Sequence, residues 1–299
     1  LSVNFSDYIQ NFVLTIFIKC YTILQEYLSE EINMNRKIAF FDIDGTLTSE
    51  IDGSIPDSTI SAIRSARENG HLMFINTGRC FQNVEKRFRD IGFDGYVCGC
   101  GTNIYCDGNE LFHISQTHDV TMQLLEAARK CNVDIIFESS KELAFDLSRP
   151  LIDPEAILEY HTFLDRNYEM PYDLENPNFF CDKFVIWFQK PEQLARFRET
   201  SDKYFTCIDR GGTFREFVPI GYSKATGLLQ VLKYYGLTKE NAYAFGDSNN
   251  DLPMLSCLPN SVAMGNASPA SLCEKVSFVT KKASEDGIAF ALKHFLFFV

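Results

Sequence analysis

Short apolar runs alternate with amphipathic stretches through the first half of the chain after residue 36. The pattern predicts strands at 37–41, 71–76 and 96–98, and helices at 57–69 and 81–91. Asp57 is a typical helix N-cap, and Gly70 stands where the first of these helices would end. Apolar strands that alternate with helices are typical of a parallel sheet buried on both faces, with right-handed crossovers.

The same alternation returns near the C-terminus, where we expect a helix at 223–235, strands at 242–245 and 261–264, a short helix after 250 and a last helix from 286. The stretch between the two halves has its own pattern, with helices expected at 120–131 and 191–204 and strands at 135–138, 183–188, 206–209 and 214–218. We therefore predict an α/β fold. Segments 34–115 and 218–299 form one parallel-sheet core, and 116–217 is an inserted α+β domain above its carboxyl edge.

Residues 1–33 differ from the rest of the chain. Their apolar stretch from Phe12 to Leu24 is interrupted by Lys19 and is too short to span a bilayer. A signal peptide is disfavoured because no Lys or Arg precedes Lys19. Met34 stands just before the first strand, so we expect the functional protein to start there and 1–33 to be a leader or non-native extension. The alternative is a docking helix that covers an apolar patch or a partner.

Composition narrows the functional classes. The 299 residues are 45% hydrophobic and 23% charged, which is typical of a globular protein and not of a disordered or collagen-like chain. The net charge of −12 disfavours nucleic acid as a main partner. Ten cysteines without a C-x-x-C pair indicate reduced thiols and a cytoplasmic location. No segment is expected to enter a membrane, and we expect a monomer or weak homo-oligomer.

The strongest chemical signal follows the first strand, where Asp42 and Asp44 precede Gly45 and Thr46. Two acids this close repel one another, so their burial at a strand end favours a bound cation, and oxygen ligands favour Mg²⁺. Gly45 permits a tight turn that directs backbone N–H groups at an anion. The alternative is a helix-capping turn that contains two aspartates by chance.

Thr77 and Gly78 follow the next strand, and Thr77 can present a hydroxyl and an amide to a phosphoryl oxygen. Lys224 falls in the first turn of a predicted helix, beside the positive end of the helix dipole, where a nearby anion would be needed to favour it. Without these companions, Lys224 would be interpreted as a solvated surface lysine.

A second acidic group follows the late strand 242–245. Asp247 offers a further metal ligand, and Asn250 and Asp251 can orient the ligands or a substrate oxygen. Because parallel strands end at one edge of a sheet, we expect Asp247 to meet Asp42 there.

Together these motifs resemble the haloacid dehalogenase superfamily of phosphotransferases, and within it the Cof-like sugar-phosphatase branch with a type IIB α/β cap. The D-x-D-G-T motif matches 42–46, the motif threonine matches Thr77, the lysine matches Lys224, and G-D-x-x-N-D matches 246–251. The resemblance covers the chain from Met34 to its end. It implies a Rossmannoid core and an inserted cap, 116–217, with an antiparallel sheet.

The resemblance also implies roles. Asp42 would be the nucleophile that forms an aspartyl-phosphate, and Asp44 would be the general acid and then the general base. Mg²⁺ would be held by Asp42, the backbone carbonyl of Asp44 and Asp247, with Asp251 behind them. The phosphate would be bound by Gly45, Thr46, Thr77, Gly78, Lys224 and Asn250. Transport ATPases of the superfamily have Thr in place of Asp44, so the acid here favours a phosphatase.

The implied function is Mg²⁺-dependent hydrolysis of small phosphomonoesters, with sugar phosphates the expected substrates. The alternatives are a phosphomutase-type phosphotransferase and a non-catalytic regulator that binds a phosphorylated metabolite. We expect Arg79 to support the core through a salt bridge. Cap residues that could touch a substrate include Phe145, Arg149, Tyr172, Phe180 and Lys183.

Overall fold

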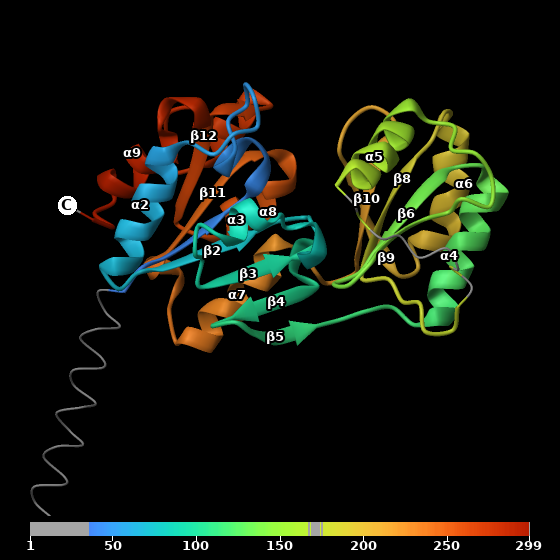
Figure 1. Ribbon diagram of the computed structural model, residues 1–299, viewed down its shortest axis with the longest axis horizontal. Coiled ribbons are helices and arrows are strands. Elements are labelled where there is room, and N and C mark those ends of the chain that lie inside the picture. The colour runs from blue at the N-terminus through green and yellow to red at the C-terminus, as the bar shows by residue number, and fades with distance from the viewer. Residues whose placement is uncertain (1–35, 167, 169–173, 175, 299) are drawn as a thin grey trace, which may run out of the picture.

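The computed structural model describes residues 36–166, 168, 174 and 176–298, which form two lobes (Figure 1). The expected leader, 1–33, and the expected start at Met34 lie outside the described residues. The larger lobe contains an eight-stranded sheet, and the smaller lobe contains a five-stranded sheet. None of the described helices has the length and apolar character needed to cross a lipid bilayer.

The larger sheet joins the two ends of the chain. Its strands are β1 (Ile38–Phe41), β2 (Leu72–Asn76), β3 (Gly95–Cys98), β4 (Asn103–Cys106), β5 (Asn109–His113), β11 (Ala242–Ser248), β12 (Asn260–Ser268) and β13 (Phe278–Val279). The order is β13-β12-β11-β1-β2-β3-β4-β5, and neighbours from β13 to β3 are parallel. β4 and β5 add an antiparallel edge. The prediction that both halves share one parallel sheet is confirmed.

Helices cover both faces of this sheet. One face packs against α2 (Asp57–Glu68) and α9 (Gly287–His294), and the other against α7 (Lys224–Tyr235) and α8 (Leu252–Cys257). Alternate β1 residues serve the two faces, because Phe41 joins the α2 and α9 core whereas Phe40 joins the α7 and α8 core. Burial on both sides explains why β1 is apolar throughout.

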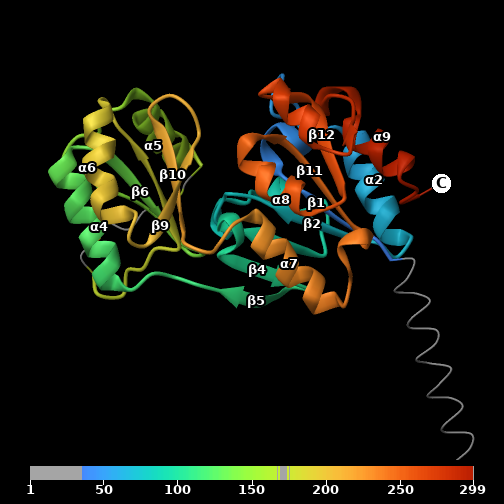
Figure 2. The ribbon, with the colours of Figure 1, turned by 180° about the vertical axis from the view of Figure 1, so that it is seen from behind.

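The smaller sheet is antiparallel, in the order β7-β6-β8-β10-β9. Its strands are β6 (Asp134–Glu138), β7 (Leu143–Phe145), β8 (Lys183–Trp187), β9 (Phe205–Asp209) and β10 (Phe214–Pro219). Helices α4 (His118–Cys131) and α6 (Pro191–Ser201) cover the face that is turned away from the larger lobe (Figure 2). Helix α5 (Pro154–Asp165) packs on the opposite face. The predicted inserted domain with a separate antiparallel sheet is therefore present.

Three details differ from the sequence prediction. The helix expected at 81–91 is instead two short pieces, η2 (Phe81–Asn83) and α3 (Lys86–Arg89). They are separated because Val84 and Glu85 have extended backbone, and the Glu85 carboxylate there binds Arg79 and Arg87. Helix α5 and strand β7 were not expected. Finally, β10 continues to Pro219, so the expected end of the inserted domain at Phe217 falls within a strand.

Candidate active site

Three strands of the larger sheet place polar residues at one edge. Asp42 follows β1 directly, Thr77 follows β2, and Asp247 lies near the end of β11. The Asp42 amide donates to the Phe245 carbonyl at 3.1 Å, which fixes the end of β1 against β11. Ligand oxygens of Asp42, Asp247 and Asp251 all lie within 4.8 Å of one another. The sequence therefore predicted correctly that acids from the two ends of the chain meet.

Lys224 enters this acidic cluster from the first position of α7. Ser223 caps the helix by accepting a hydrogen bond from the Thr226 amide at 3.2 Å. The Lys224 side chain is only 1% exposed, and its Nζ lies 2.6 Å from both Asp42 Oδ1 and Asp251 Oδ1. Asn76 also holds the lysine, because its Nδ2 donates to the Lys224 carbonyl at 3.0 Å. These two carboxylates offset the unfavourable position of a cation at a helix N-terminus.

The cluster has more negative than positive charge. Burial and repulsion from Asp251 raise the pKa of Asp42 to about 7, although Lys224 opposes the shift. Burial, Asp42 and Asp251 raise the pKa of Asp247 to about 8. Burial alone would lower the pKa of Lys224, but Asp251 and Asp42 raise it above its ordinary value. Three carboxylates thus share one ammonium group, an arrangement that a divalent cation would stabilise.

The oxygens of the cluster are not equally engaged. Asp251 uses Oδ1 for Lys224, and its Oδ2 accepts from the amides of Asp247 and Ser248 at 2.9 and 3.1 Å. Among the described residues, no hydrogen bond reaches Oδ2 of Asp42 or Oδ2 of Asp247. The donor set therefore fits a hard divalent cation such as Mg²⁺, with Asp42 and Asp247 as ligands and Asp251 as the residue that positions them.

The turn after β1, Ile43–Leu47, brings the first motif against Asp247. The Thr46 hydroxyl lies 3.4 Å from Asp247 Oδ1, and Asn266 donates to the Gly45 carbonyl at 2.7 Å. Gly45 has φ +76°, and a Cβ there would lie 2.3 Å from Asp247 Oδ2. Its amide donates to the Thr48 hydroxyl at 3.1 Å. Glycine is thus required both for the backbone conformation and for the approach of Asp247.

We expect Gly45→Ala to lower the free energy of unfolding by about 2 kcal/mol and to reduce the phosphatase activity that the sequence motifs imply. Urea denaturation and steady-state kinetics measure the two effects. Gly53→Ala is the matched control, because Gly53 has φ +69° but a Cβ there would have no other atom within 4 Å. If both variants lost the same unfolding free energy and the same activity, the close approach of Asp247 to Gly45 would contribute to neither.

Asp44 lies apart from the buried cluster, and its side chain is 65% exposed. Arg79 binds it through two nitrogens, Nη2 at 2.6 Å from Oδ1 and Nε at 3.1 Å from Oδ2. The same guanidinium binds Glu85 at 3.1 Å. Arg79 forms the salt bridge expected from the sequence, but its partner is an acid of the site itself.

Thr77, Gly78 and Asn250 complete the core side of the site. The Thr77 amide donates to the Val97 carbonyl at 2.9 Å, so its hydroxyl is the group available to a phosphoryl oxygen. That hydroxyl accepts from the Arg79 amide at 3.2 Å. Gly78 allows a close approach of the smaller lobe, because a Cβ there would lie 3.0 Å from Glu216 Oε1. Asn250 is hydrogen bonded to the Ser248 hydroxyl.

A cavity of about 350 Å³ lies between the lobes and is lined by both. The larger lobe contributes Asp42, Asp44, Thr77, Gly78, Arg79, Asn83, Ser248 and Asn250. The smaller lobe contributes Glu138, Glu159, Arg166, Lys183, Val185, Arg210, Phe214 and Glu216. Of the residues expected near a phosphate, Thr77, Gly78 and Asn250 line this space together with the expected cap residue Lys183. Gly45, Thr46 and Lys224 do not line it.

The charged wall of the smaller lobe is an ion-pair network around Lys183. Its Nζ lies 2.7 Å from Glu138 and 3.1 Å from Glu216, and Arg210 lies 3.7 Å from Glu216. Sequence analysis named Lys183 but missed its partners. The available signal was an acid beside apolar residues in each strand, Glu138 after Phe137 in β6 and Glu216 before Phe217 in β10.

The other expected cap residues lie elsewhere. Phe145 packs in the apolar cluster beneath α5, Arg149 binds Asp134 at 3.0 Å, and Phe180 is exposed. None of these three lines the cavity. Tyr172 lies outside the described residues.

A family model described as haloacid dehalogenase-like hydrolase matches residues 39–292. The chain belongs to this family. This haloacid dehalogenase-like hydrolase is 30% identical to YkrA of Bacillus subtilis (strain 168). The alignment spans 262 residues and covers 87% of this chain and 98% of YkrA. It is 27% identical to 5-amino-6-(5-phospho-D-ribitylamino)uracil phosphatase YitU of the same organism, over 85% of this chain and 95% of YitU.

Its fold is similar to that of BT4131, a sugar phosphatase of haloacid dehalogenase subclass IIB, with a TM-score of 0.74 and 24% sequence identity. The similarity covers 88% of this chain and all of BT4131. This haloacid dehalogenase-like hydrolase is thus a phosphatase, and its larger lobe with the inserted antiparallel lobe has the fold of BT4131.

Proposed function

We propose that this phosphatase hydrolyses small phosphomonoesters in a Mg²⁺-dependent reaction through an aspartyl-phosphate on Asp42. The observation that supports the proposal most directly is that Asp42, which lines the cavity between the lobes, lies beside both Asp247 and Lys224. Sugar phosphates are the proposed substrate class, since BT4131 is named a sugar phosphatase. The proposed location is the cytoplasm, and a monomeric or weakly oligomeric state remains a prediction.

In the first proposed step, an Asp42 carboxylate oxygen attacks phosphorus, and the bond from phosphorus to the leaving oxygen breaks. Asp44 donates its proton to that oxygen, so the product leaves as an alcohol. In the second step, water attacks phosphorus, Asp44 accepts a proton from it, and Asp42 is released with inorganic phosphate. Asp44 suits both steps because it lines the cavity and is more exposed than Asp42.

The remaining polar groups hold the phosphoryl group. Lys224 neutralises charge beside Asp42, and the Thr77 hydroxyl, the Gly45–Thr46 turn, Gly78 and Asn250 contact phosphoryl oxygens in the proposed complex. A Mg²⁺ ion held by Asp42, Asp247 and the Asp44 carbonyl would supply electrostatic stabilisation of the charge that develops on the phosphoryl oxygens. Arg79 holds Asp44 at the cavity wall until the substrate arrives.

We further propose that 116–219, which extends the expected 116–217 to the end of β10, acts as the cap over a core made of 34–115 and 220–299. The cap supplies the wall of the cavity that contains Lys183, Glu138 and Glu216. Such a wall would exclude bulk water from the phosphoryl group and contact the leaving group.

Release of p-nitrophenol from p-nitrophenyl phosphate tests this proposal. We expect activity with Mg²⁺ and a loss of at least about tenfold when the ion is chelated, with recovery when Mg²⁺ is added back. Asp247→Asn should weaken the dependence of the rate on Mg²⁺ concentration, whereas Asp94→Asn, which removes a core acid paired with Arg67, should not. Activity that is unaffected by chelation would contradict the proposed ion dependence.

A further inference from the structure

The cap face that looks toward the core changes character along its strands. Residues alternate between faces in a strand, so Lys183, Val185 and Trp187 of β8 share this face. Lys183 stands opposite Glu138 and belongs to the charged network beside the core. Trp187 stands opposite Phe214, and the two rings stack with centroids 4.9 Å apart. Polar groups near the phosphate-binding residues therefore give way to aromatic groups farther along β8.

A second cavity of about 340 Å³ lies over the apolar part of this face, between the strands and α5. Its apolar walls include Ile136, Leu143, Leu158, Phe163, Trp187 and Phe214. Five residues line both this cavity and the active-site cavity: Asn83, Glu138, Glu159, Val185 and Phe214. The two spaces therefore adjoin. The size of the second cavity falls in the range of roughly 300–1,000 Å³ that is usual for small-molecule sites.

Glu159 marks the junction of the two cavities. It lines both, and no hydrogen bond or ion pair to its carboxylate is formed by the part of the chain that the structure describes. Burial raises its pKa, with weaker opposing effects from Arg166 and Arg79. A half-buried carboxylate without a donor is costly unless a ligand supplies one. Glu159 is thus suited to accept a hydrogen bond from a hydroxyl or amino group of a substrate.

We propose that the second cavity binds a flat apolar or aromatic group on the leaving side of the phosphomonoester. This inference rests on the phosphatase activity proposed above and narrows its substrate class. The substrate then has three parts: a phosphate at the core, a short polar linker with a donor for Glu159, and a ring against Trp187, Phe214 and α5. A sugar or polyol can serve as the linker, but a sugar phosphate alone leaves the aromatic cavity without an apolar partner.

Paired phosphate esters test the proposal. We expect kcat/KM for 2-phenylethyl phosphate to exceed that for ethyl phosphate by at least about tenfold, because only the former places a ring in the second cavity. Comparable kcat/KM values for the two esters would contradict the proposal while leaving the phosphatase activity intact.

Binding can be measured separately from turnover, because Trp187 is the single tryptophan of the chain. We expect 2-phenylethylphosphonate, which cannot be hydrolysed, to change the Trp187 emission in a saturable manner, and ethylphosphonate to leave it unchanged. Saturable binding without hydrolysis of any ester would support the cavity assignment and contradict the proposed activity. No emission change with either phosphonate would contradict the cavity assignment.

Two leucines of α5 provide a matched pair of variants. Leu158 is 68% exposed and lines the second cavity, whereas Leu164 is 43% exposed and lines neither cavity. We expect Leu158→Asp to reduce the preference for 2-phenylethyl phosphate over ethyl phosphate by about fivefold or more, since it places a charge at the rim of an apolar space. Leu164→Asp should retain the parent preference. Equal preferences in both variants would contradict the proposal.

Discussion

Asp42→Asn is expected to reduce phosphatase turnover by at least about a thousandfold, because an amide oxygen cannot replace the carboxylate as the nucleophile. The fold should persist. Asn has nearly the same shape, Lys224 keeps its 2.6 Å contact with Asp251, and the substitution removes one of three mutually repelling acids. Steady-state kinetics measure the first effect, and thermal unfolding without divalent ions should show an unchanged or higher midpoint.

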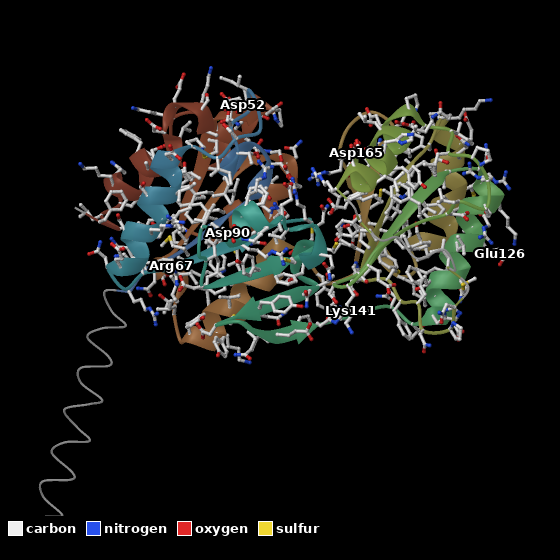
Figure 3. The ribbon with its side chains drawn as sticks, viewed as in Figure 1. Asp52, Arg67, Asp90, Glu126, Lys141 and Asp165 are labelled. Atoms are coloured by element: carbon white, nitrogen blue, oxygen red, sulfur yellow. The ribbon has the colours of Figure 1, made fainter. Side chains whose placement is uncertain are left out.

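Asp52→Asn is the control for loss of one negative charge, since Asp52 is an exposed acid in a loop of the larger lobe (Figure 3). It should keep the parent rate. Turnover of Asp42→Asn above about one-tenth of the parent value would contradict the assignment of the nucleophile. Incubation of parent and variant with a ³²P-labelled substrate adds a direct test, because only the parent should acquire acid-stable label at this position.

Lys224→Met is expected to impair both stability and activity. It leaves Asp42 and Asp251 buried without their shared cation, and loss of one partner from a buried ion pair costs about 3 kcal/mol or more. Activity should fall at least about a hundredfold, since in the proposed mechanism Lys224 also neutralises charge on the phosphoryl group. Urea unfolding in the presence of a chelator measures the stability, and phosphate release measures the activity.

The stability loss in Lys224→Met should depend on pH in a defined direction. The pKa of Asp42 is already raised to about 7 in the parent, so protons bind the folded state more readily than the unfolded state. Protonation relieves the repulsion, and the difference from the parent should shrink as pH falls from about 8 to about 5. Lys233→Met, an exposed lysine of the same helix, is the control. If Lys224→Met lost no more unfolding free energy than Lys233→Met, Lys224 would not neutralise the cluster of Asp42, Asp247 and Asp251.

The sequence predicted the core well because its central strands β1 and β2 are almost entirely apolar and its helices have clear ends. Helix α7 is an example, with Ser223 as the N-cap and Gly236 at φ +66° as the C-cap. A single helix at 81–91 was wrong because the backbone is extended at Val84 and Glu85, where the Glu85 carboxylate binds Arg79 and Arg87. Helix α5 was missed although Asp153 and Pro154 form a standard start signal.

The acidic cluster was predictable from chain order, because residues that follow parallel strands must meet at one edge. The pairing of Arg79 with Asp44 was not, since it depends on how the turn after β2 directs the guanidinium. The ion-pair network on the cap side of the cavity was harder to predict than either of these. Glu138, Lys183 and Glu216 meet only through antiparallel register between β6, β8 and β10, and single-sequence patterns do not specify register.

The central position of β1 has a consequence for the order of events during synthesis on the ribosome. β1 emerges early, but one of its two neighbours, β11, lies more than two hundred residues later, after the whole cap. The cap has its own apolar cores and can fold while one edge of β1 is still unpaired. Asp42 therefore remains without Lys224 and Asp247 until the last part of the chain is made, so an incomplete chain cannot assemble the catalytic centre.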